Sequence, residues 1–462
     1  MKDAQLASLP YWLSEKSIGM ILYASDNYGS CATNFALCKV IEEFGYTPVL
    51  LDSYVPLQGV SAKYLLSHFH YIGEILQNDC KISDLNDLFN CFILGSDYSL
   101  NIEASFTAKY IDYFLMAFAD DTKKKLAYAP CLGKPDVEHD PCLRYLYARL
   151  LQRFQLVTFR EKSAVELCGK FFGRPSYQVL DPVFLVDSKV FYRIVEESQS
   201  KVDMMSTNTK AYLLAYILDY TFEKQKLIEK TADNLGLDYR IILDSSQYAF
   251  FSMDSLCNPK IVSKPTFEEW LCLIAKASFV VTDSFHGTCF ALYFHKNYIS
   301  LKNRNTSRFD SLVYLLKHEN ESRKVHIYAS VEDAMNDLER LEKLNFSFID
   351  SCIVSERIKC KQILSSALSM DVSNDFLAET PREHNDLIHY VDLWKRSYFQ
   401  KLNSEQFLLY TPLKSILRQR IKRYIWHVCS QLKCLKIIDL LFPKYTARRQ
   451  YMIIKIKKFL RI

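Results

Sequence analysis

Four short turns carry the residue types that could do chemistry, and each of them directly follows a run of apolar residues. They are DNYGS at 26–30, GSD at 95–97, REKS at 160–163 and DSFHG at 283–287. Small residues in such turns let backbone amides approach a ligand, and the N-terminus of a following helix favours an anion. Because Asp, Ser and Asn are also ordinary helix caps, each turn taken singly has a purely structural interpretation as well.

The candidates for catalysis are a histidine, an arginine and two carboxylates from these turns. His286 could bind phosphate or donate a proton, although a histidine beside apolar residues is usually a core residue. Arg160 could bind a carboxylate or phosphate through two hydrogen bonds, or form a structural ion pair. Asp26, Asp97 or Asp283 could act as a base or orient a hydroxyl. We therefore predict that His286, Arg160, Asp26 and Asp97 are catalytic.

Further residues of the turns are candidates for binding a substrate. Arg304 and Arg308 follow the next predicted strand after His286, where they could complete a cationic pocket or lie in a solvated loop. The predicted substrate-binding residues are Arg308, Arg304, Ser284, Gly287, Asn27, Tyr28, Gly29, Ser96 and Asp283. Neither a glycine-rich dinucleotide fingerprint nor a GxxxxGK[ST] loop occurs, and the 11 glycines are too few for long glycine-rich loops. These absences argue against a nicotinamide or ATP-hydrolysing enzyme. No metal site is apparent in the sequence either, and we expect no cofactor.

The elements that must position these turns alternate between strands and helices. Apolar runs at 18–24, 47–51, 91–94, 125–129, 156–159 and 178–180 predict five or six strands in the first half. A second series has strands at 211–218, 239–243, 279–282 and 298–301, with helices at 222–235 and 267–276. This alternation predicts an α/β protein with two doubly wound parallel sheets. Ligands in such folds gather at the carboxyl ends of the strands, often in the cleft between domains.

The predicted organisation is a Rossmann-like domain at 1–185, a second one at 186–370 and an appended helical region at 371–462. The polar segment EESQSKVDMMSTN at 196–208 lacks periodicity and predicts a loop at or near the boundary between the two sheets. Residues 347–370 predict a closing helix.

Charge is distributed unevenly along the 462 residues, whose formal net charge is +5. Residues 410–462 hold 14 Lys and Arg against a single acidic residue, a net charge of +13, and the remainder carries −8. Apolar residues of this basic tail fall at helical spacing, which suits a helix lying in a membrane interface or one docked on the body. Nucleic-acid binding is a weaker interpretation because no recognition fold accompanies the charge.

Composition and targeting signals point to the cytoplasm. Hydrophobic residues make up 49% and charged residues 24%, which excludes wholesale disorder. No apolar run approaches the ~18 residues that a membrane span requires, and the N-terminal residues do not resemble a signal peptide. Most of the 14 cysteines lie in apolar stretches and none forms a Cys-x-x-Cys pair, so we expect reduced, buried thiols.

The ordered set of turns resembles the polysaccharide pyruvyl transferase family. Each motif of that family has a counterpart here, and together they cover about residues 18–370. The matching residues are Asn27-Tyr28-Gly29 with Ala36-Leu37, Gly95-Ser96-Asp97, Tyr128-Ala129 with Gly133, Arg160-Glu161-Lys162-Ser163, Leu180-Asp181-Pro182, Ser284-Phe285-His286-Gly287, and Arg308 with Ser311-Leu312.

This resemblance implies two domains arranged as in the GT-B glycosyltransferases. It also implies transfer of the enolpyruvyl group of phosphoenolpyruvate to two hydroxyls of a sugar, which gives a pyruvate ketal and releases phosphate. His286, Arg160 and Arg308 would then bind or activate phosphoenolpyruvate, which is the donor substrate and not a cofactor. The first domain would bind the sugar or lipid-linked oligosaccharide acceptor and the second would bind phosphoenolpyruvate. Exopolysaccharide or capsule assembly would be the setting, and the basic tail, which lies beyond the residues of the resemblance, could hold the protein at the inner face of the plasma membrane.

Two departures from the family pattern fall in the first domain. Tyr98-Ser99-Leu100-Asn101 follows Gly-Ser-Asp where the family often has Gln and an aromatic residue, and Cys31-Ala32-Thr33-Asn34 stands where a Leu-Gln pair is common. Both concern the acceptor more than the donor. A nucleotide-sugar glycosyltransferase of the same architecture and a catalytically idle scaffold of a glycan-assembly complex are the alternative functions.

Overall fold

A computed structural model describes residues 10–23, 27–52, 57, 59–74, 81–101, 109–133, 141–205, 211–243, 260–262, 264–303, 306–316, 325–372, 389 and 391–396. Contacts divide the chain into two compact units, Met1–Tyr390 and Val391–Ile462. Of the second unit only residues 391–396 are described, and they are helical. The basic tail at 410–462 lies outside the described residues, so its helices and its partner stay predictions.

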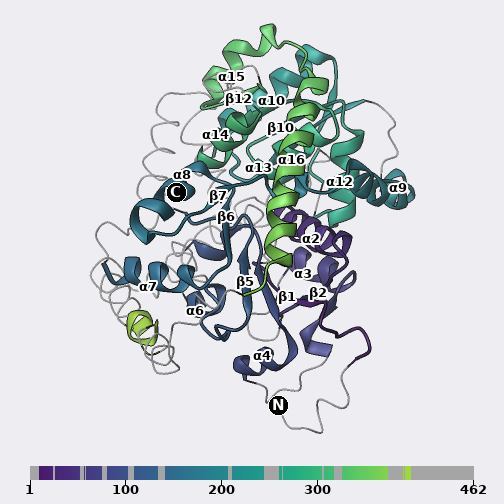
Figure 1. Cartoon of the computed structure of the whole chain (residues 1–462). Coiled ribbons are helices and arrows are strands. Elements are labelled where there is room, and N and C mark those ends of the chain that lie inside the picture. Colours follow the sequence, from purple (N-terminus) through teal and green to yellow (C-terminus); the bar gives the residue numbers. More distant parts are fainter. Residues whose placement is uncertain are drawn as a thin grey trace, which may run out of the picture. The chain divides into compact units, whose positions relative to one another are not determined.

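The strands of the first unit form two parallel sheets (Figure 1). Seven strands pair in the order β3-β2-β1-β4-β5-β6-β7: β1 Ser17–Ile21, β2 Thr47–Leu50, β3 His70–Tyr71, β4 Cys91–Leu94, β5 Lys124–Ala127, β6 Leu156–Phe159 and β7 Tyr177–Gln178. Five pair in the order β12-β11-β10-β8-β9: β8 Tyr212–Ile217, β9 Asp238–Leu243, β10 Phe279–Thr282, β11 Asn297–Leu301 and β12 Ile327–Tyr328. The predicted α/β class with two Rossmann-like sheets is confirmed.

Helices connect the strands and cover the sheets. Their bounds are α2 Tyr28–Glu43, α3 Gly59–Leu66, α4 Leu85–Leu88, α6 Ile111–Phe114, α7 Pro141–Gln152, α8 Lys162–Leu167, α9 Ser188–Met205, α10 Phe222–Leu235, α12 Phe267–Lys276, α13 Phe285–Tyr293, α14 Thr306–Leu315, α15 Val331–Asp337 and α16 Phe346–Ser369, with a short 3-10 helix η5 at Pro182–Phe184. Strand order reverses between β1 and β4 in one sheet and between β8 and β10 in the other. Such reversal points open a crevice at the carboxyl ends of the strands.

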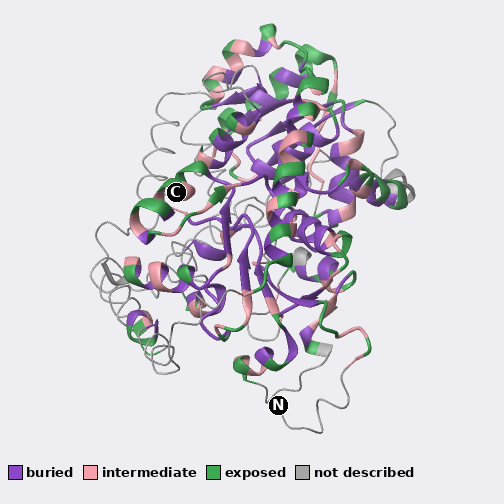
Figure 2. Cartoon of the chain, in the orientation of Figure 1, coloured by how far each residue is buried: buried purple, intermediate pink, exposed green. Residues whose placement is uncertain are grey.

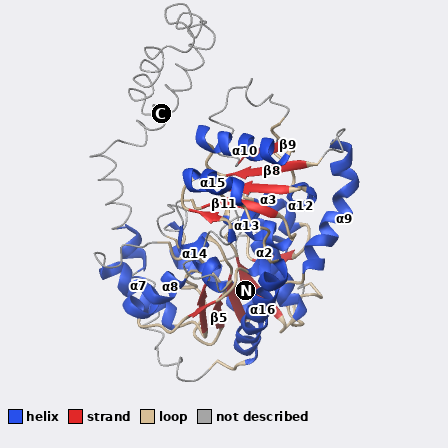
Figure 3. Cartoon of the chain, turned by 90° about the horizontal axis from the view of Figure 1, so that it is seen from above, coloured by secondary structure: helices blue, strands red, loops and turns tan. Residues whose placement is uncertain are grey.

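The second sheet is apolar on both faces because each face meets helices. Alternate residues of β8 point to opposite faces. Leu213 and Ala215 join a core with residues of α10 and α15, whereas Leu214 and Tyr216 join a larger core with residues of α9, α12 and α13. Figure 3 shows α10 and α15 together above β8 and β11. This two-sided burial explains why the strand reads as a continuous apolar run.

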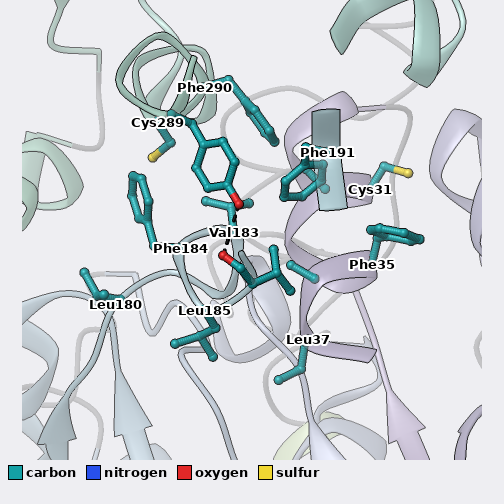
Figure 4. Packing of buried hydrophobic residues seen from close by; sticks show 14 of the residues in the cluster. Cys31, Phe35, Leu37, Leu180, Val183, Phe184, Leu185, Phe191, Cys289 and Phe290 are labelled. Carbon is teal, nitrogen blue, oxygen red and sulfur yellow. Dashed lines mark hydrogen bonds between the residues drawn. The ribbon is translucent and has the colours of Figure 1, made fainter. Parts of the chain in front are cut away.

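The larger core continues from the second sheet to the first. Figure 4 shows Phe35 of α2, Phe191 of α9 and Phe290 of α13 gathered around Val183 and Phe184 of η5. Buried residues fill the strands and inner helices, and exposed ones lie on the outer helices (Figure 2). Shared burial of this kind fixes the turns of one sheet against those of the other.

The closing helix α16 contacts elements of both sheets (Figure 1). Arg357 Nε donates to the carbonyl of Phe184 at 2.6 Å, and Lys361 forms an ion pair with Glu43 of α2 at 2.6 Å. Near its N-terminal end, His295 after α13 lies 2.9 Å from Asp350. The predicted helix at 347–370 is therefore confirmed to within one residue at each end.

Two sequence-based expectations need correction. The predicted loop at 196–208 is wrong as far as Met205, because α9 continues through its polar residues. The first turns of α9 bury Phe191, Ile194 and Val195. Packing of these residues stabilises the helix, and the helix continues into a polar segment that shows no hydrophobic periodicity. The two-residue strands β3 and β12 were also not predicted, and β3 brings the first sheet to seven strands. The domain boundaries at 185 and 370 stay a prediction.

Candidate functional site

The turn after β4 has a strained backbone at Asp97. Asp97 has a φ of +71°, a region that residues other than glycine rarely adopt. Its carbonyl accepts from the backbone amide of Cys131 at 2.6 Å, and Ser96 Oγ donates to the carbonyl of Ala129 at 3.0 Å. Bonds to the turn after β5 therefore hold the Asp97 carboxylate in place at the carboxyl edge of the sheet.

Arg160 follows β6 and contacts three carboxylates. Its Nε lies 3.2 Å from Glu161 Oε1, its Nη1 2.6 Å from Asp181 Oδ2 and its Nη2 3.2 Å from Asp97 Oδ1. The side chain is 2% exposed. Because β4, β5, β6 and β7 are neighbours, the turns after β4, β6 and β7 converge on this one guanidinium.

Asp181 joins the arginine to the histidine of the second sheet. It caps η5 with Oδ1, which accepts from the Val183 amide at 3.1 Å and from Thr33 Oγ1 at 2.9 Å. Burial alone would raise the pKa of Asp181, but His286, Arg160 and the Val183 amide together hold that pKa well below its usual range. The carboxylate is therefore ionised throughout the neutral pH range.

His286 lies in the first turn of α13, which Ser284 caps by accepting from the Gly287 amide at 3.2 Å. Its Nε2 is 3.4 Å from Asp181 Oδ2, although the geometry of a hydrogen bond is not met. The imidazole packs against the backbone of Gly29, at the start of α2. A Cβ at Gly29 would lie 2.1 Å from His286 Nδ1, so only glycine leaves room for the ring.

Arg308 approaches the same carboxylates from α14. Its Nε is 3.3 Å from Glu161 Oε1 and its Nη2 is 3.6 Å from Asp97 Oδ1. The guanidinium lies over the ring of Tyr98, 4.5 Å from the ring centroid. The amide of Lys162 donates to Ser311 Oγ at 3.1 Å, one turn along α14, and this bond fixes the helix beside the turn after β6.

The structure thus brings together four predicted residues: Asp97, Arg160, His286 and Arg308. All are buried, with side chains 2–8% exposed. We call these four residues together with Glu161 and Asp181 the carboxyl-edge cluster. Its arginines and histidine could bind an anion, its histidine could transfer a proton, and its carboxylates could orient hydroxyl groups.

Other predicted residues make hydrogen bonds that stabilise the turns beside the cluster. Both oxygens of Asp283 are engaged, since Oδ1 accepts from the amide of Leu218 and Oδ2 accepts from the Asp219 amide and from Lys224 Nζ. Asn27 caps α2 by accepting from the amides of Gly29 and Ser30. These bonds tie down the turns next to the cluster.

Two further predicted residues serve packing between the sheets. Tyr28 donates its hydroxyl to the carbonyl of Pro265 and stacks on Trp270, with ring centroids 5.4 Å apart. Gly287 lets α13 approach β10, since a Cβ there would lie 2.4 Å from Thr282 Oγ1. Asp26 and Arg304 lie outside the described residues, so their predicted roles stay predictions.

Sequence reasoning did not select Glu161, Asp181 or Thr33 as site residues. Glu161 and Asp181 belong to turns that directly follow predicted strands, and that position is the signal that could have identified them. Thr33 gave no signal, because it lies inside a helix and meets Asp181 only through the tertiary fold. Among the described residues, no group of three or more His, Cys, Asp or Glu side chains could hold a metal ion.

The fold and the cluster define an α/β protein with a buried, charged site at the carboxyl ends of parallel strands. Comparison with protein families adds the identity: the family model for polysaccharide pyruvyl transferase matches residues 27–305. The chain belongs to this family, which confirms the resemblance, and the family domain suggests a transferase. A search of curated protein sequences found no match. Of the described helices, none is both long and apolar enough to cross a membrane.

Solved structures were compared as well. HepE of Anabaena, in complex with UDP and glucose, is 11% identical, with a TM-score of 0.44 and coverage of 76% of this chain and 99% of HepE. UDP-GlcNAc 2-epimerase of Neisseria meningitidis, bound to UDP-GlcNAc, is 10% identical, with a TM-score of 0.45 and coverage of 76% and 99%. A glycosyltransferase of Rickettsia africae is 10% identical, with a TM-score of 0.38 and coverage of 75% and 98%. Scores at this level give no information about substrate.

Proposed function

We propose that this protein transfers the enolpyruvyl group of phosphoenolpyruvate to two hydroxyls of a sugar, forming a pyruvate ketal and releasing phosphate. The observation that carries the proposal is the convergence of Arg160, Arg308 and His286 in one buried cluster of a chain that belongs to the polysaccharide pyruvyl transferase family. Phosphoenolpyruvate presents a phosphate and a carboxylate, and guanidinium and imidazolium groups are suited to both.

The reaction needs one proton delivered to carbon and two removed from hydroxyls. Protonation of the methylene carbon places positive charge on C2, and the first sugar hydroxyl attacks C2 and loses its proton. The bond from C2 to the phosphate oxygen then breaks, phosphate leaves, and the second hydroxyl attacks and loses its proton. One of the released protons replaces the one given to the methylene carbon, and the other leaves with phosphate or solvent.

The cluster offers groups for each of these transfers. His286 supplies the candidate acid, and its Nε2 lies 3.4 Å from the carboxylate of Asp181. Asp97 is available as a base or as an acceptor that orients a sugar hydroxyl. Burial of the cluster strengthens each electrostatic interaction there relative to water.

The test is phosphate release from phosphoenolpyruvate in the presence of a panel of p-nitrophenyl hexopyranosides, alongside calorimetric titration with phosphoenolpyruvate. We expect the wild-type chain to bind phosphoenolpyruvate saturably and His286→Ala to lose about 10²–10⁴-fold in turnover, the usual contribution of a general acid. His295→Ala is the matched control, because His295 is half exposed and pairs with Asp350 away from the cluster.

Near-normal turnover in folded His286→Ala contradicts the proposed role of the histidine. Release of nucleotide from nucleotide sugars, without binding of phosphoenolpyruvate, would indicate a glycosyltransferase instead. If the chain binds neither phosphoenolpyruvate nor a nucleotide sugar, the result would favour a catalytically idle scaffold.

The setting of the reaction is part of the same proposal. A sugar or lipid-linked oligosaccharide of exopolysaccharide or capsule assembly is the acceptor, and the basic tail at 410–462 holds the enzyme at the anionic inner face of the plasma membrane. The net charge of +13 on the tail supports this placement, since each near-surface Lys or Arg contributes about 1 kcal/mol against anionic lipid. Deletion of residues 410–462 should abolish sedimentation with anionic liposomes, and unchanged sedimentation would contradict the membrane role.

A further inference from the structure

The two arginines of the carboxyl-edge cluster differ in how their donors are used. Each of the three nitrogens of Arg160 has a carboxylate oxygen within 3.2 Å, from Glu161, Asp181 and Asp97. All three contacts also meet hydrogen-bond geometry. One positive charge therefore holds three negative charges that come from the ends of different strands.

Arg308 is close to the same carboxylates but is not hydrogen-bonded to them. Its Nε and Nη2 lie 3.3 Å from Glu161 and 3.6 Å from Asp97, and neither atom has a hydrogen-bond partner within the part of the chain that the structure describes. His286 Nε2 likewise has no hydrogen-bond partner among the described residues, although it lies 3.4 Å from Asp181 Oδ2. The atoms themselves are buried.

Buried donors are nearly always hydrogen-bonded in folded proteins, so each exception needs an explanation. Other buried polar atoms of the described residues also lack a hydrogen-bond partner, among them Trp270 Nε1, Tyr298 Oη and Gln155 Nε2, and within the cluster the acceptor Glu161 Oε2. What sets the carboxyl-edge cluster apart is that three unpartnered nitrogens gather there, two from Arg308 on α14 and one from His286 on α13. A ligand that brings several acceptor oxygens would satisfy all three.

We infer that Arg308 and His286 bind the anionic groups of the donor, and that Arg160 is a positioning residue that does not touch it. This inference rests on the proposed function and divides its arginines by role. Arg160 acts through its carboxylates: it holds Asp181 beside His286 and holds Asp97 and Glu161 beside Arg308. The guanidinium of Arg308 also makes a cation–π contact with the ring of Tyr98.

The two roles respond differently to lysine. An ammonium group has three donors and a full charge, so a lysine at 160 can still serve three carboxylates. It lacks the planar fork with which an arginine binds two oxygens of a phosphate or carboxylate, so a lysine at 308 cannot replace that contact. Conservative substitution therefore separates positioning from direct binding.

The experiment is calorimetric titration of the full-length chain with phosphoenolpyruvate and, separately, with inorganic phosphate. Arg308→Lys should weaken both affinities at least about tenfold, whereas Arg160→Lys should stay within about threefold of the wild type. Arg160→Gln, which loses the charge, should lose at least about tenfold because the carboxylates then repel the anion. Arg153→Lys is the matched control, since Arg153 is equally buried and pairs with Asp121 away from the cluster.

Equal losses in Arg160→Lys and Arg308→Lys would overturn the division of roles, and so would unchanged affinity in Arg308→Lys. Unchanged affinity in folded Arg160→Gln would show that Arg160 is merely structural, which also overturns it. If the wild-type chain binds neither probe, the proposed function itself fails, and that result is distinct from the others.

Discussion

Two buried charged clusters lie at the first sheet, one at the amino ends of its strands and one at the carboxyl ends. They differ in how many of their hydrogen-bond donors have partners. At the amino edge, Arg153 pairs with Asp121 at 2.7 Å and donates to the carbonyls of Met116 and Ala119. Lys125, in the same cluster, donates to the carbonyls of Asp120 at 2.6 Å and Lys123 at 2.9 Å. We call this the amino-edge cluster.

At the carboxyl edge, by contrast, Arg308 and His286 keep buried nitrogens without hydrogen-bond partners among the described residues. Both clusters bury cations to a similar extent, so burial of charge does not distinguish a functional site. The two clusters differ in how many of their hydrogen-bond donors have partners. The cations of the amino-edge cluster donate mainly to backbone carbonyls of nearby loops, whereas Arg308 and His286 of the carboxyl-edge cluster keep donors without partners among the described residues. This difference supports a structural role for the amino-edge cluster, and it supports the ligand binding proposed above for the carboxyl-edge cluster.

The largest expected effect tests the structural role of the amino-edge cluster. Arg153→Met leaves the Asp121 carboxylate and two buried carbonyls without their cation, which costs about 3–5 kcal/mol in the free energy of unfolding. Urea denaturation followed by circular dichroism measures this loss. Arg193→Met, on the exposed face of α9, is the control and should be near neutral.

At a temperature where Arg153→Met remains folded, its affinity for phosphoenolpyruvate should equal that of the wild type. A tenfold loss of affinity would show that the two clusters are coupled, and the comparison between the two edges would then fail.

A second prediction concerns pH and the same cluster. Burial, followed by the charge of Arg153, lowers the pKa of Lys125 to about 7, against the opposing effects of Asp121, Asp120 and Cys91. Between about pH 7 and 10 the unfolded chain keeps this lysine protonated while the folded chain holds it neutral. The unfolded state then binds more protons, so stability rises with pH over this window.

The rise should amount to a few kcal/mol in total, at about 1.4 kcal/mol for each unit of pKa shift. Urea midpoints at about pH 6.5, 8 and 9.5 measure it. Lys125→Met should show a flatter profile, and an equally steep rise in that variant would mean that another group is responsible.

Much of the fold follows from local pattern. The helices Phe222–Leu235 and Phe267–Lys276 and the strand Phe279–Thr282 match their predicted bounds, and local signals explain why. Thr266 and Glu269 form a capping box at the start of α12, and Gly236 ends α10 in the left-handed conformation. The strands β3 and β12 carry no such signal, because two residues are too few to show a period.

The candidate site was predictable by position but not by partner. Arg160 and His286 were placed correctly at strand ends, where parallel sheets bind ligands. Which carboxylates meet Arg160 depends on β4, β5, β6 and β7 being neighbours, and sequence order does not reveal that. The same holds for Asp283, whose carboxylate is bonded to backbone amides that lie 64 and 65 residues away in sequence.

The smallest change that should break the carboxyl-edge cluster is one methyl group. Gly29→Ala places a Cβ 2.1 Å from His286 Nδ1 and 2.4 Å from its Cγ, so the imidazole must leave its present position beside Asp181. A shift of about 1 Å in a reacting group can cost 10²-fold in rate, whereas such overpacking costs only about 1–3 kcal/mol of stability. We expect phosphate release to fall about a hundredfold in a protein that remains folded.

Gly169→Ala is the control for this substitution, because nothing lies within 4 Å of the added methyl group. Comparing turnover and thermal unfolding of the two variants separates displacement of the histidine from a general effect of alanine. Wild-type turnover in Gly29→Ala would mean that the position of His286 against Gly29 does not matter for catalysis. The amino-edge cluster should be indifferent to this methyl group, so the pH profile of stability set by Lys125 should be the same in Gly29→Ala as in the wild type.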